Sequence, residues 1–170
     1  KLRAKEKPSI EDYSKLQNFR VSYKEDLACV FKIISDLATE IRSDSIVSLR
    51  IKRIESIISK IRREPTMGLG NMGDVAGCRV ILHDRTSLDN LVSVIKTEFG
   101  DDIKIKNYIR NPKPDGYNGY HFYVKSPKND KKLVEIQLRT YQTHRWASLV
   151  EILDNIFGNK IKEGEDIPDL

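Results

Sequence analysis

Residues Leu133–Thr140 read LVEIQLRT, and apolar and polar side chains alternate from Val134 to Arg139. Alternation with a period of two is typical of a β-strand whose two faces meet different surroundings. One face would be apolar and would pack against a core. The opposite face would carry three reactive groups, namely Glu135, Gln137 and Arg139.

The stretch Tyr120–Lys125 alternates in the same way, and its polar face would hold His121, Tyr123 and Lys125. One face of an antiparallel sheet is often solvated, so polar residues on a single strand do not by themselves indicate a site. For each strand taken alone, a solvated face is therefore an open alternative.

The run Ile46–Arg53 predicts a third strand of this kind, half-buried and with its own polar row. Its apolar side would be Val47, Leu49 and Ile51, and its polar side would include Arg50 and Lys52. Three such rows, flanked by two Gly-rich loops, favour a cleft over a solvated surface. Arginine beside Glu, Gln and His suits charge-assisted hydrogen bonds to a polyphosphate.

The remaining elements follow from apolar periodicity, capping residues and glycines. Helices are predicted over Glu11–Arg20, Tyr23–Ile41, Ile54–Arg63 and Thr143–Phe157, and from a cap at Thr86 or Ser87 to Phe99. Strands are predicted over Cys78–His83, in a central position, and over Asp102–Ile109, at an edge. The expected fold class is α+β, with a mixed, mostly antiparallel sheet of about five strands flanked by helices.

The chain has 170 residues, 39% of them hydrophobic, which is enough to build a core for one domain. We divide it into an N-terminal helical segment (residues 1–45), a main domain (46–157) and a polar C-terminal tail (158–170). The net charge of +5 favours polyanionic partners, although only mildly.

Two features of the sequence bear on its location. No apolar run approaches the roughly 18 residues that a membrane-spanning helix needs, and the first residues lack the apolar stretch of a secretory signal. These features predict a cytoplasmic protein that does not associate with a membrane. The two cysteines, Cys29 and Cys78, have the spacing of neither a zinc site nor a CxxC redox pair.

The run RIKRIESIISK, residues 50–60, concentrates cationic and hydroxyl groups. Ser56 and Lys60 are four residues apart on a predicted helix, so they share one face. With Arg50 and Lys52 just before them, they form a place where a triphosphate can lie. A solvated amphipathic helix with ordinary surface lysines is the simpler alternative.

Two carboxylates predict a metal site. Asp74 lies in the segment GDVAGCRVIL, directly before an apolar strand, and Glu135 lies on a neighbouring strand. Mg²⁺ is typically held by one or two carboxylates together with phosphate oxygens. The pair therefore predicts Mg²⁺ for phosphate chemistry. The alternative for Asp74 is the N-cap of a helix.

Motifs exclude two other enzyme classes. The dipeptide His83–Asp84 occurs in metal phosphohydrolases, but such sites need further His and Asp ligands on helices. This chain has only three histidines, and His83 ends a predicted strand. A Ser-His-Asp hydrolase is excluded as well, because the sequence contains no GxSxG motif.

The order of four motifs, RIKRIESIISK, GDVAGCRVIL, NPKPDGYNGYHFYV and VEIQLRT, resembles the synthetase domain of the RelA/SpoT family. Members of this family are alarmone synthetases, which transfer pyrophosphate from ATP to a ribose 3′-hydroxyl. The resemblance covers about residues 46 to 150. It implies a nucleotidyltransferase-like fold and a pyrophosphokinase domain over residues 46–157. Without an HD hydrolase or regulatory domain, the chain resembles a small, stand-alone synthetase.

The resemblance implies roles for residues on the ATP side. The residues that would hold ATP are Arg50, Lys52, Ser56, Lys60 and Arg79. The two arginines would clamp the adenine between their guanidinium planes, which suits arginine and not lysine. Asp74 and Glu135 would bind Mg²⁺, and Glu135 would also activate the attacking hydroxyl.

The resemblance also implies an acceptor site. The residues that would bind the acceptor are Lys113, Tyr117, His121 and His144. Tyr117 would stack on the acceptor base, while Lys113 and His121 would contact its phosphates. Gln137 and Arg139 would support the site from behind.

The sequence departs from the family pattern only on the acceptor side, at Asp115, Asn118, Gly119, His144 and Val150–Glu151. The acceptor therefore stays open between GDP or GTP, which is preferred, and the 3′ end of tRNA, which some toxin-type small synthetases modify. A catalytically inactive module that binds nucleotide or RNA is a third alternative.

The resemblance further implies protein partners. Small synthetases often form homo-oligomers, so we expect one here. A toxin-type member would need a restraining antitoxin protein. The segment Lys160–Leu170 or the N-terminal helices would be the place for it to dock.

Overall fold

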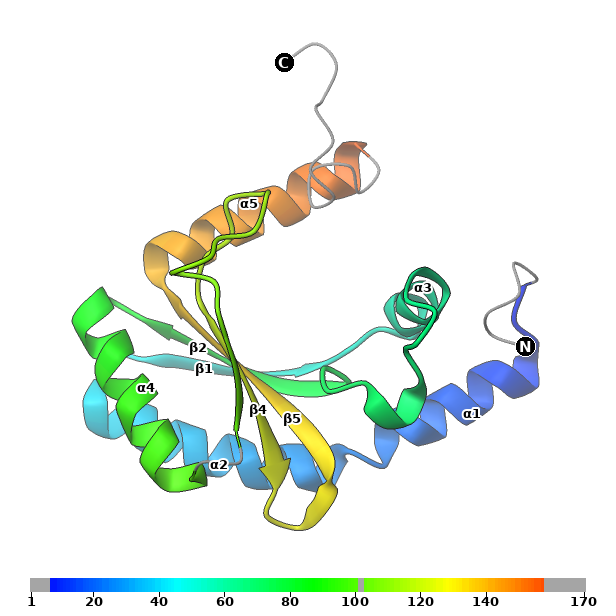
Figure 1. Cartoon of the computed structure of the whole chain (residues 1–170), viewed down its shortest axis with the longest axis horizontal. Helices are drawn as coiled ribbons and strands as arrows, with labels where there is room; N and C mark the ends of the chain where they lie inside the picture. The colour runs from blue at the N-terminus through cyan, green and yellow to red at the C-terminus, as the bar shows by residue number, and fades with distance from the viewer. Residues whose placement is uncertain (1–6, 101–102, 158–170) are drawn as a thin grey trace.

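The LVEIQLRT strand lies at the centre of a five-stranded sheet in the computed structural model, which describes residues 7–100 and 103–157. The strand order is β1-β2-β5-β4-β3 (Figure 1). The strands are β1 Ile46–Ile51, β2 Ala76–Leu82, β3 Lys104–Asn107, β4 Tyr120–Ser126 and β5 Asn129–Thr140. β2 and β5 pair in parallel, and the other pairs are antiparallel. The predicted α+β fold with a mixed, mostly antiparallel sheet is confirmed.

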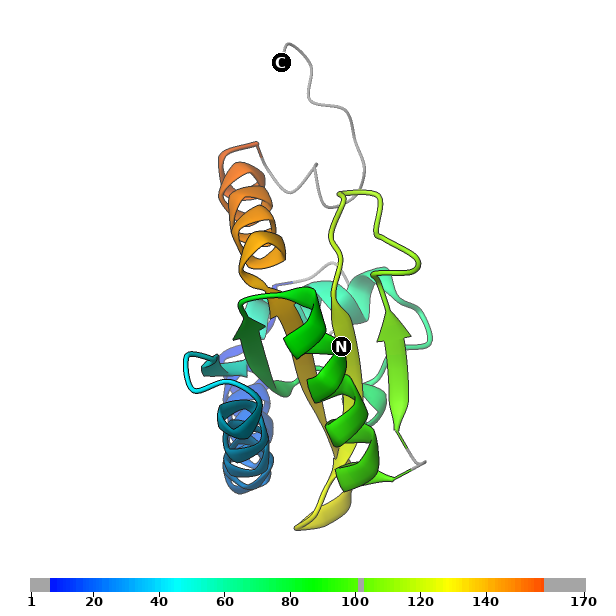
Figure 2. The ribbon, with the colours of Figure 1, turned by 90° about the vertical axis from the view of Figure 1, so that its left-hand side faces the viewer.

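The helices cover the two faces of the sheet differently. They are α1 Ile10–Val21, α2 Lys24–Ile41, α3 Ile54–Arg63, α4 Arg85–Phe99 and α5 Tyr141–Phe157, with a short 3₁₀ turn, η1, at Leu69–Asn71. Helices α2 and α4 lie side by side against one face, whereas α3 and α5 lie toward the other (Figures 1 and 2). Among the residues that the structure describes, no helix is both long and apolar enough to cross a membrane.

The hydrophobic core forms between the sheet and the pair α2 and α4. Apolar residues at spacings of three and four line one side of α2, where Leu27, Val30 and Ile34 are buried. The other apolar residues of this side pack against the core, and they are Phe31, Leu37 and Ile41. The sheet contributes Phe122 and Ile136, both completely buried. Burying one such side chain is worth about 1.5–3 kcal/mol. This apolar layer fixes one face of the sheet and leaves the opposite face to the polar residues.

Strand β1 differs from its prediction as a half-buried strand. Of its apolar side, Val47 packs against the core, but Leu49 is 54% exposed and Ile51 is 37% exposed. β1 lies at the edge of the sheet and pairs on one side only. Its side chains therefore have fewer neighbours than those of a central strand.

Some element boundaries also differ from the predictions. The cap of α4 is Asp84, whose Oδ1 accepts a hydrogen bond from the Ser87 backbone N–H at 2.8 Å, so neither Thr86 nor Ser87 is the cap. Strand β5 begins earlier than predicted, because it continues into a tight hairpin with β4. Helix α5 begins at Tyr141 instead of Thr143. The predicted tail, residues 158–170, lies outside the described residues, and the three-segment division stays a prediction.

A partly buried ion pair connects the β4–β5 hairpin to α2. Lys132 Nζ donates to Asp26 Oδ2 at 2.8 Å and to the backbone carbonyl of Ser22, and it lies 5.1 Å from the ring centre of Tyr23. The Asp26 side chain is 5% exposed. Burial alone would raise the pKa of Asp26, but the hydrogen bond and charge of Lys132 outweigh it and lower that pKa.

This pair makes stability depend on pH. Because the folded-state pKa of Asp26 is lowered, its contribution is present above the unfolded-state pKa of about 3.9 and is lost as the pH falls through the folded-state value. We expect Asp26→Asn to reduce the free energy of unfolding by about 1–3 kcal/mol at pH 7, and the difference from wild type to shrink below pH 4. Urea unfolding at several pH values measures this. The exposed neighbour Glu25 gives the control, Glu25→Gln; equal losses for the two variants would contradict the prediction.

Candidate active site

The sheet register brings the three predicted polar rows onto one face. Across the strands, Arg50 lies opposite Gly77, Gly77 opposite Glu135, and Glu135 opposite Tyr123. The next row contains Ser48, Arg79, Gln137, His121 and Lys106. Since residues in register share a face of a sheet, polar groups far apart in the sequence become neighbours.

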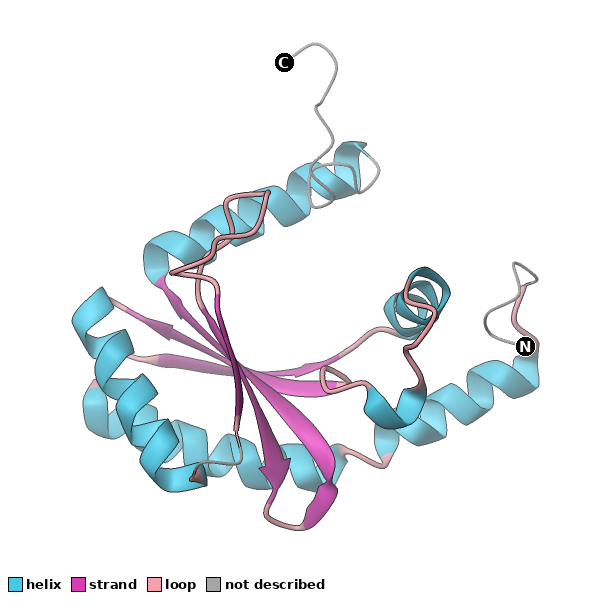
Figure 3. Cartoon of the chain, viewed as in Figure 1, coloured by secondary structure: helices cyan, strands magenta, loops and turns pink. Residues whose placement is uncertain are grey.

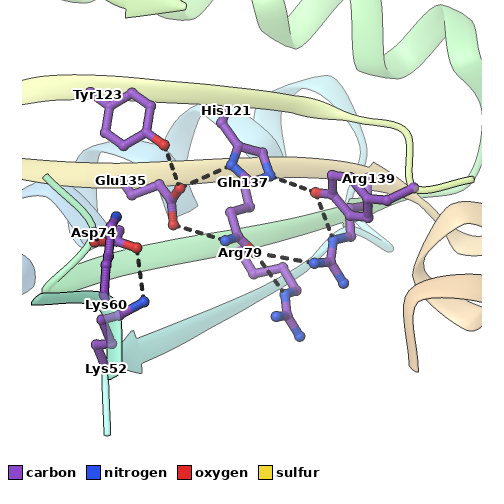
Figure 4. A network of polar contacts seen from close by, with 10 residues as sticks. Lys52, Lys60, Asp74, Arg79, His121, Tyr123, Glu135, Gln137 and Arg139 are labelled. Carbon is purple, nitrogen blue, oxygen red and sulfur yellow. Dashed lines mark hydrogen bonds and ion pairs between the residues drawn. The ribbon is translucent and has the colours of Figure 1, made fainter. Parts of the chain in front are cut away.

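Glu135 is the centre of this face (Figure 4). Its Oε1 accepts hydrogen bonds from His121 Nδ1 at 2.9 Å and from the Tyr123 hydroxyl at 3.0 Å. Its Oε2 accepts one from Gln137 Nε2 at 2.8 Å. The residue is only 5% exposed. Both carboxylate oxygens are therefore oriented by side chains of β4 and β5.

The surroundings of Glu135 keep it ionised. Burial by itself would raise the pKa of a carboxyl group. The hydrogen bonds from His121, Gln137 and Tyr123 outweigh this effect and lower the pKa of Glu135 to about 2. At neutral pH the side chain is thus a buried carboxylate, which can bind a cation or accept a proton from a substrate.

The polar network continues behind Glu135. The Tyr117 hydroxyl lies 2.6 Å from His121 Nε2, and Arg139 Nε donates to that hydroxyl at 3.2 Å. Gln137 Oε1 accepts longer hydrogen bonds, both 3.4 Å, from Arg79 Nε and Arg139 Nη2. Gln137 and Arg139 are each 4% exposed. The alternative of a solvated sheet face is therefore wrong for β5.

Asp74 forms a second acidic centre, where α3 and the segments at the ends of β1 and β2 meet. Its Oδ2 accepts a hydrogen bond from Lys52 Nζ at 2.9 Å and its Oδ1 one from Lys60 Nζ at 3.0 Å. Burial would raise the pKa of Asp74, but the two lysines outweigh it and lower that pKa. Asp74 precedes strand β2 and begins no helix, so the N-cap alternative is wrong.

The backbone positions Lys52 for this contact. Its N–H donates to the Val75 carbonyl at 2.8 Å, and its own carbonyl accepts a hydrogen bond from Arg20 Nε at 2.8 Å. Helix α1 and the start of β2 thus hold the segment between β1 and α3. Ser56 lies on α3 with Lys60, as the spacing predicted, and its side chain is exposed.

The predicted adenine-binding arginines lie on the same polar face as Glu135. Arg50 is exposed on β1, and Arg79 is half-buried on β2. Burial and the nearby charges of Arg139 and Arg50 lower the pKa of Arg79. This cluster of positive charge favours an anionic ligand or a planar group that the guanidinium planes can stack on.

The acceptor side differs from the sequence prediction. Tyr117 is 6% exposed, and two cations lie over its ring, Lys113 Nζ at 4.9 Å and Arg139 Cζ at 4.8 Å from the ring centre. Lys113 Nζ also lies 4.9 Å from the ring centre of Tyr108. In this conformation the ring of Tyr117 is not open to a base, and stacking would require Lys113 to move.

The loop that carries Lys113 and Tyr117 is held against α5 (Figure 3). Trp146 Nε1 donates to the Asp115 carbonyl at 2.9 Å, and Asp115 Oδ1 accepts from the Tyr117 N–H at 2.9 Å. His144, on the first part of α5, is half-buried, and its Nδ1 is buried without a hydrogen-bond partner within the described residues. Burial and the charges of Arg139 and Arg79 lower the pKa of His144, which favours a neutral ring.

Sequence reasoning missed three residues of this site. Tyr108 and Trp146 hold the acceptor-side loop, and Tyr123 binds Glu135. Alternation placed Tyr123 on the polar face of its strand. Pairing that strand with LVEIQLRT in register would have indicated its contact with Glu135. For Tyr108 and Trp146 the sequence gives no such signal, because their contacts depend on the path of the loop.

The carboxylates of Asp74 and Glu135 suit a hard cation only when a substrate supplies further oxygen ligands. In residues 7–100 and 103–157, no group of three or more His, Cys, Asp or Glu side chains could hold a metal ion. Asp74 and Glu135 are carboxylates on one side of the sheet (Figure 4). Mg²⁺ typically takes one or two carboxylates and completes its octahedron with phosphate oxygens and water, so this donor set fits Mg²⁺ bound with a nucleotide.

Comparisons with known proteins bear on the family and the fold. Residues 49–152 match the model described as "Region found in RelA / SpoT proteins". The chain is 35% identical over 113 residues to GTP pyrophosphokinase YwaC of Bacillus subtilis, a match that covers 59% of this chain and 53% of that protein. The chain thus matches only about half the length of that relative.

Solved structures give the same result for the fold. The small alarmone synthetase 1 of Bacillus subtilis superposes with a TM-score of 0.73 at 26% identity, covering 88% of this chain and 83% of that one. A structure of the same synthetase bound to its product pppGpp gives a TM-score of 0.71 at 24% identity, covering 91% and 84%.

Gly77 generates a prediction, because it lies between Arg50 and Glu135 in the central row. A Cβ at Gly77 would lie 2.6 Å from the Glu135 carbonyl oxygen and 3.3 Å from the Glu135 Cβ. We expect Gly77→Ala to destabilise the fold by about 1–3 kcal/mol through overpacking. Gly70→Ala is the matched control, since a Cβ there has nothing within 4 Å. Urea unfolding compares the two, and equal stabilities would contradict the close approach at Gly77.

Proposed function

The chain belongs to the RelA/SpoT family, and on that premise we propose that it is an ATP-dependent pyrophosphokinase. It transfers pyrophosphate from ATP to the ribose 3′-hydroxyl of GDP or GTP and releases AMP. The observation that carries this proposal is the buried, ionised carboxylate of Glu135, which shares one polar face with Asp74, two lysines and two arginines. Relatives named GTP pyrophosphokinase support the same reaction.

ATP binds across β1, α3 and β2 in this proposal. Lys52 and Lys60 donate hydrogen bonds to Asp74 in this structure. On ATP binding, both ammonium groups move to the triphosphate. Ser56 adds a hydroxyl donor from the same face of α3. Arg50 and Arg79 hold the adenine between their planes. The cost of separating the lysines from Asp74 is offset because phosphate oxygens give each ammonium a new anionic partner.

Asp74 and Glu135 would hold Mg²⁺ together with the phosphates. Bound there, Mg²⁺ would neutralise charge on the β- and γ-phosphates and polarise the phosphorus–oxygen bonds. Once the lysines have turned to the phosphates, both oxygens of Asp74 become available as ligands. Glu135 keeps the hydrogen bonds from His121 and Gln137, which fix its orientation.

The reaction is an in-line displacement at the β-phosphorus. Glu135 accepts the proton of the acceptor 3′-hydroxyl, and that oxygen forms a bond to the β-phosphorus. The bond between the β-phosphorus and the oxygen that bridges to the α-phosphorus breaks, and its electron pair leaves with AMP. The protein contributes mainly positioning and charge neutralisation, as is general for phosphoryl transfer.

The acceptor binds between the β3–β4 loop and the first part of α5. Tyr117 offers its ring to the base after Lys113 has left it for the acceptor phosphates. The neutral His144 presents an unpartnered Nδ1 to the edge of the base. A second acceptor is the 3′ end of tRNA, which Lys104, Lys106 and Arg110 would favour because they are exposed beside this loop.

The reaction class is tested at Glu135. We expect Glu135→Gln to lower the rate of AMP release from labelled ATP, in the presence of Mg²⁺ and GDP, by about 10²–10⁴-fold because the proton acceptor is lost. Glu11→Gln, an exposed carboxylate on α1, is the control and should turn over like wild type. Wild-type turnover by Glu135→Gln would refute the mechanism. Nucleotide binding without AMP release by the wild-type protein would instead indicate an inactive binding module.

The acceptor is tested by supplying γ-labelled ATP with GDP, GTP or total tRNA in separate reactions. We expect label on GDP or GTP. Label on tRNA alone would contradict the guanine-nucleotide proposal and favour the toxin-type reaction. Salt gives a second readout, because tRNA binding weakens steeply with ionic strength through counterion release, whereas binding of a small nucleotide is less sensitive.

A further inference from the structure

We infer that His121 and the Tyr117 hydroxyl are positioning elements that orient the carboxylate of Glu135 for the reaction, through a continuous hydrogen-bonded chain from Arg139. This inference rests on the proposed function, because it concerns the same carboxylate. The resemblance assigned these two residues only to the acceptor, His121 to its phosphates and Tyr117 to its base. In the structure both ring nitrogens of His121 and the hydroxyl of Tyr117 are hydrogen-bonded within the protein, which leaves the ring of Tyr117, but no N–H of His121, for the acceptor.

The donors and acceptors in the chain can be assigned one by one. An ionised carboxylate can only accept, so the 2.9 Å contact requires His121 Nδ1 to carry the proton that it donates to Glu135. The Tyr117 hydroxyl accepts a hydrogen bond from Arg139 Nε at 3.2 Å, since a guanidinium can only donate. Its own hydrogen then needs an acceptor, and His121 Nε2 lies 2.6 Å away, so Nε2 accepts and carries no proton. Every hydrogen has one acceptor, so the chain selects one tautomer of His121.

The four residues of this hydrogen-bonded chain are buried, so each of its hydrogen bonds affects the site. His121 is 6% exposed, Tyr117 6%, Arg139 4% and Glu135 5%. Water has little access to replace a lost hydrogen bond, and an unpaired polar group in such a place is costly. A carboxylate that can rotate would direct its free lone pair in several directions, whereas the hydrogen-bonded chain fixes that lone pair in one direction.

The chain also connects the two halves of the reaction. The ring of Tyr117 belongs to the acceptor side. Its hydroxyl is hydrogen-bonded to His121, and His121 in turn is hydrogen-bonded to Glu135, the carboxylate that takes the proton of the acceptor hydroxyl. The hydroxyl contact lies at the edge of the ring, whereas Lys113 lies over its face. An acceptor base can therefore replace Lys113 on the ring while the hydroxyl stays on His121. Acceptor binding and the orientation of Glu135 are thus linked through Tyr117 and His121.

Substitutions at Tyr117 and His121 test the hydrogen-bonded chain by steady-state kinetics. Tyr117→Phe keeps the ring for stacking and removes the hydroxyl, so we expect kcat to fall about tenfold, the effect of one buried hydrogen bond. The KM for the acceptor should stay within about twofold of wild type. At position 121, Asn places an amide where Nδ1 was, and Gln places one where Nε2 was. We expect His121→Asn to retain a higher kcat than His121→Gln.

A raised acceptor KM with unchanged kcat in Tyr117→Phe and in both position-121 variants would overturn the inference, because it would assign these groups to acceptor binding alone. Equal kcat values for His121→Asn and His121→Gln would also overturn it. Circular dichroism during thermal unfolding checks that each variant is folded.

Nitrogen-15 NMR of the substrate-free wild-type protein at pH 7.5 gives a readout that does not depend on activity or on a variant. We expect the His121 ring to be neutral with its proton on Nδ1. A proton on Nε2, alone or with one on Nδ1, would overturn the inference. If the wild-type protein transferred no pyrophosphate to any acceptor, the proposed function would fail. The tautomer of His121 would still decide whether these hydrogen bonds run from Arg139 to Glu135.

Discussion

The structure depends on one constraint, that the Glu135 carboxylate stays ionised although it is buried in the middle of a sheet. A buried carboxylate without partners would take up a proton, because the desolvation of a charge is costly. Here three side chains donate to its two oxygens, and they come from its own strand and from β4. The order of the strands, the register of β4 against β5 and the absence of a side chain at Gly77 all serve this arrangement.

The same constraint explains the division of the sheet into two chemically different faces. The apolar face packs against α2 and α4 and supplies the stability that a row of buried polar groups does not. The polar face carries an excess of positive charge around Arg79 and Arg139, and burial together with this charge lowers the pKa of Arg79. A nucleotide polyphosphate with its metal ion would bring the missing negative charge. The site is thus complementary in charge to its proposed substrate.

Much of this could be predicted from the sequence, because alternation along a strand is a local property. The pattern of LVEIQLRT placed Glu135, Gln137 and Arg139 on one face, and the spacing of Ser56 and Lys60 placed them on one face of α3. Contacts that depend on a loop path or on the position of a strand within the sheet were not predictable. The burial of Tyr117 under Lys113 follows from the conformation of the β3–β4 loop, and the exposure of Leu49 follows from the edge position of β1.

In the proposed reaction the acceptor hydroxyl meets the Glu135 carboxylate beside an ATP held by Lys52 and Lys60. A crystal structure with Mg²⁺, GDP and a non-hydrolysable ATP analogue measures this directly. We expect the ribose 3′-oxygen within hydrogen-bonding distance of Glu135, a metal ion bound by Asp74 and Glu135, and the β-phosphorus in line with that oxygen. A nucleotide pair bound away from this face of the sheet, or a 3′-oxygen that contacts another base, would contradict it.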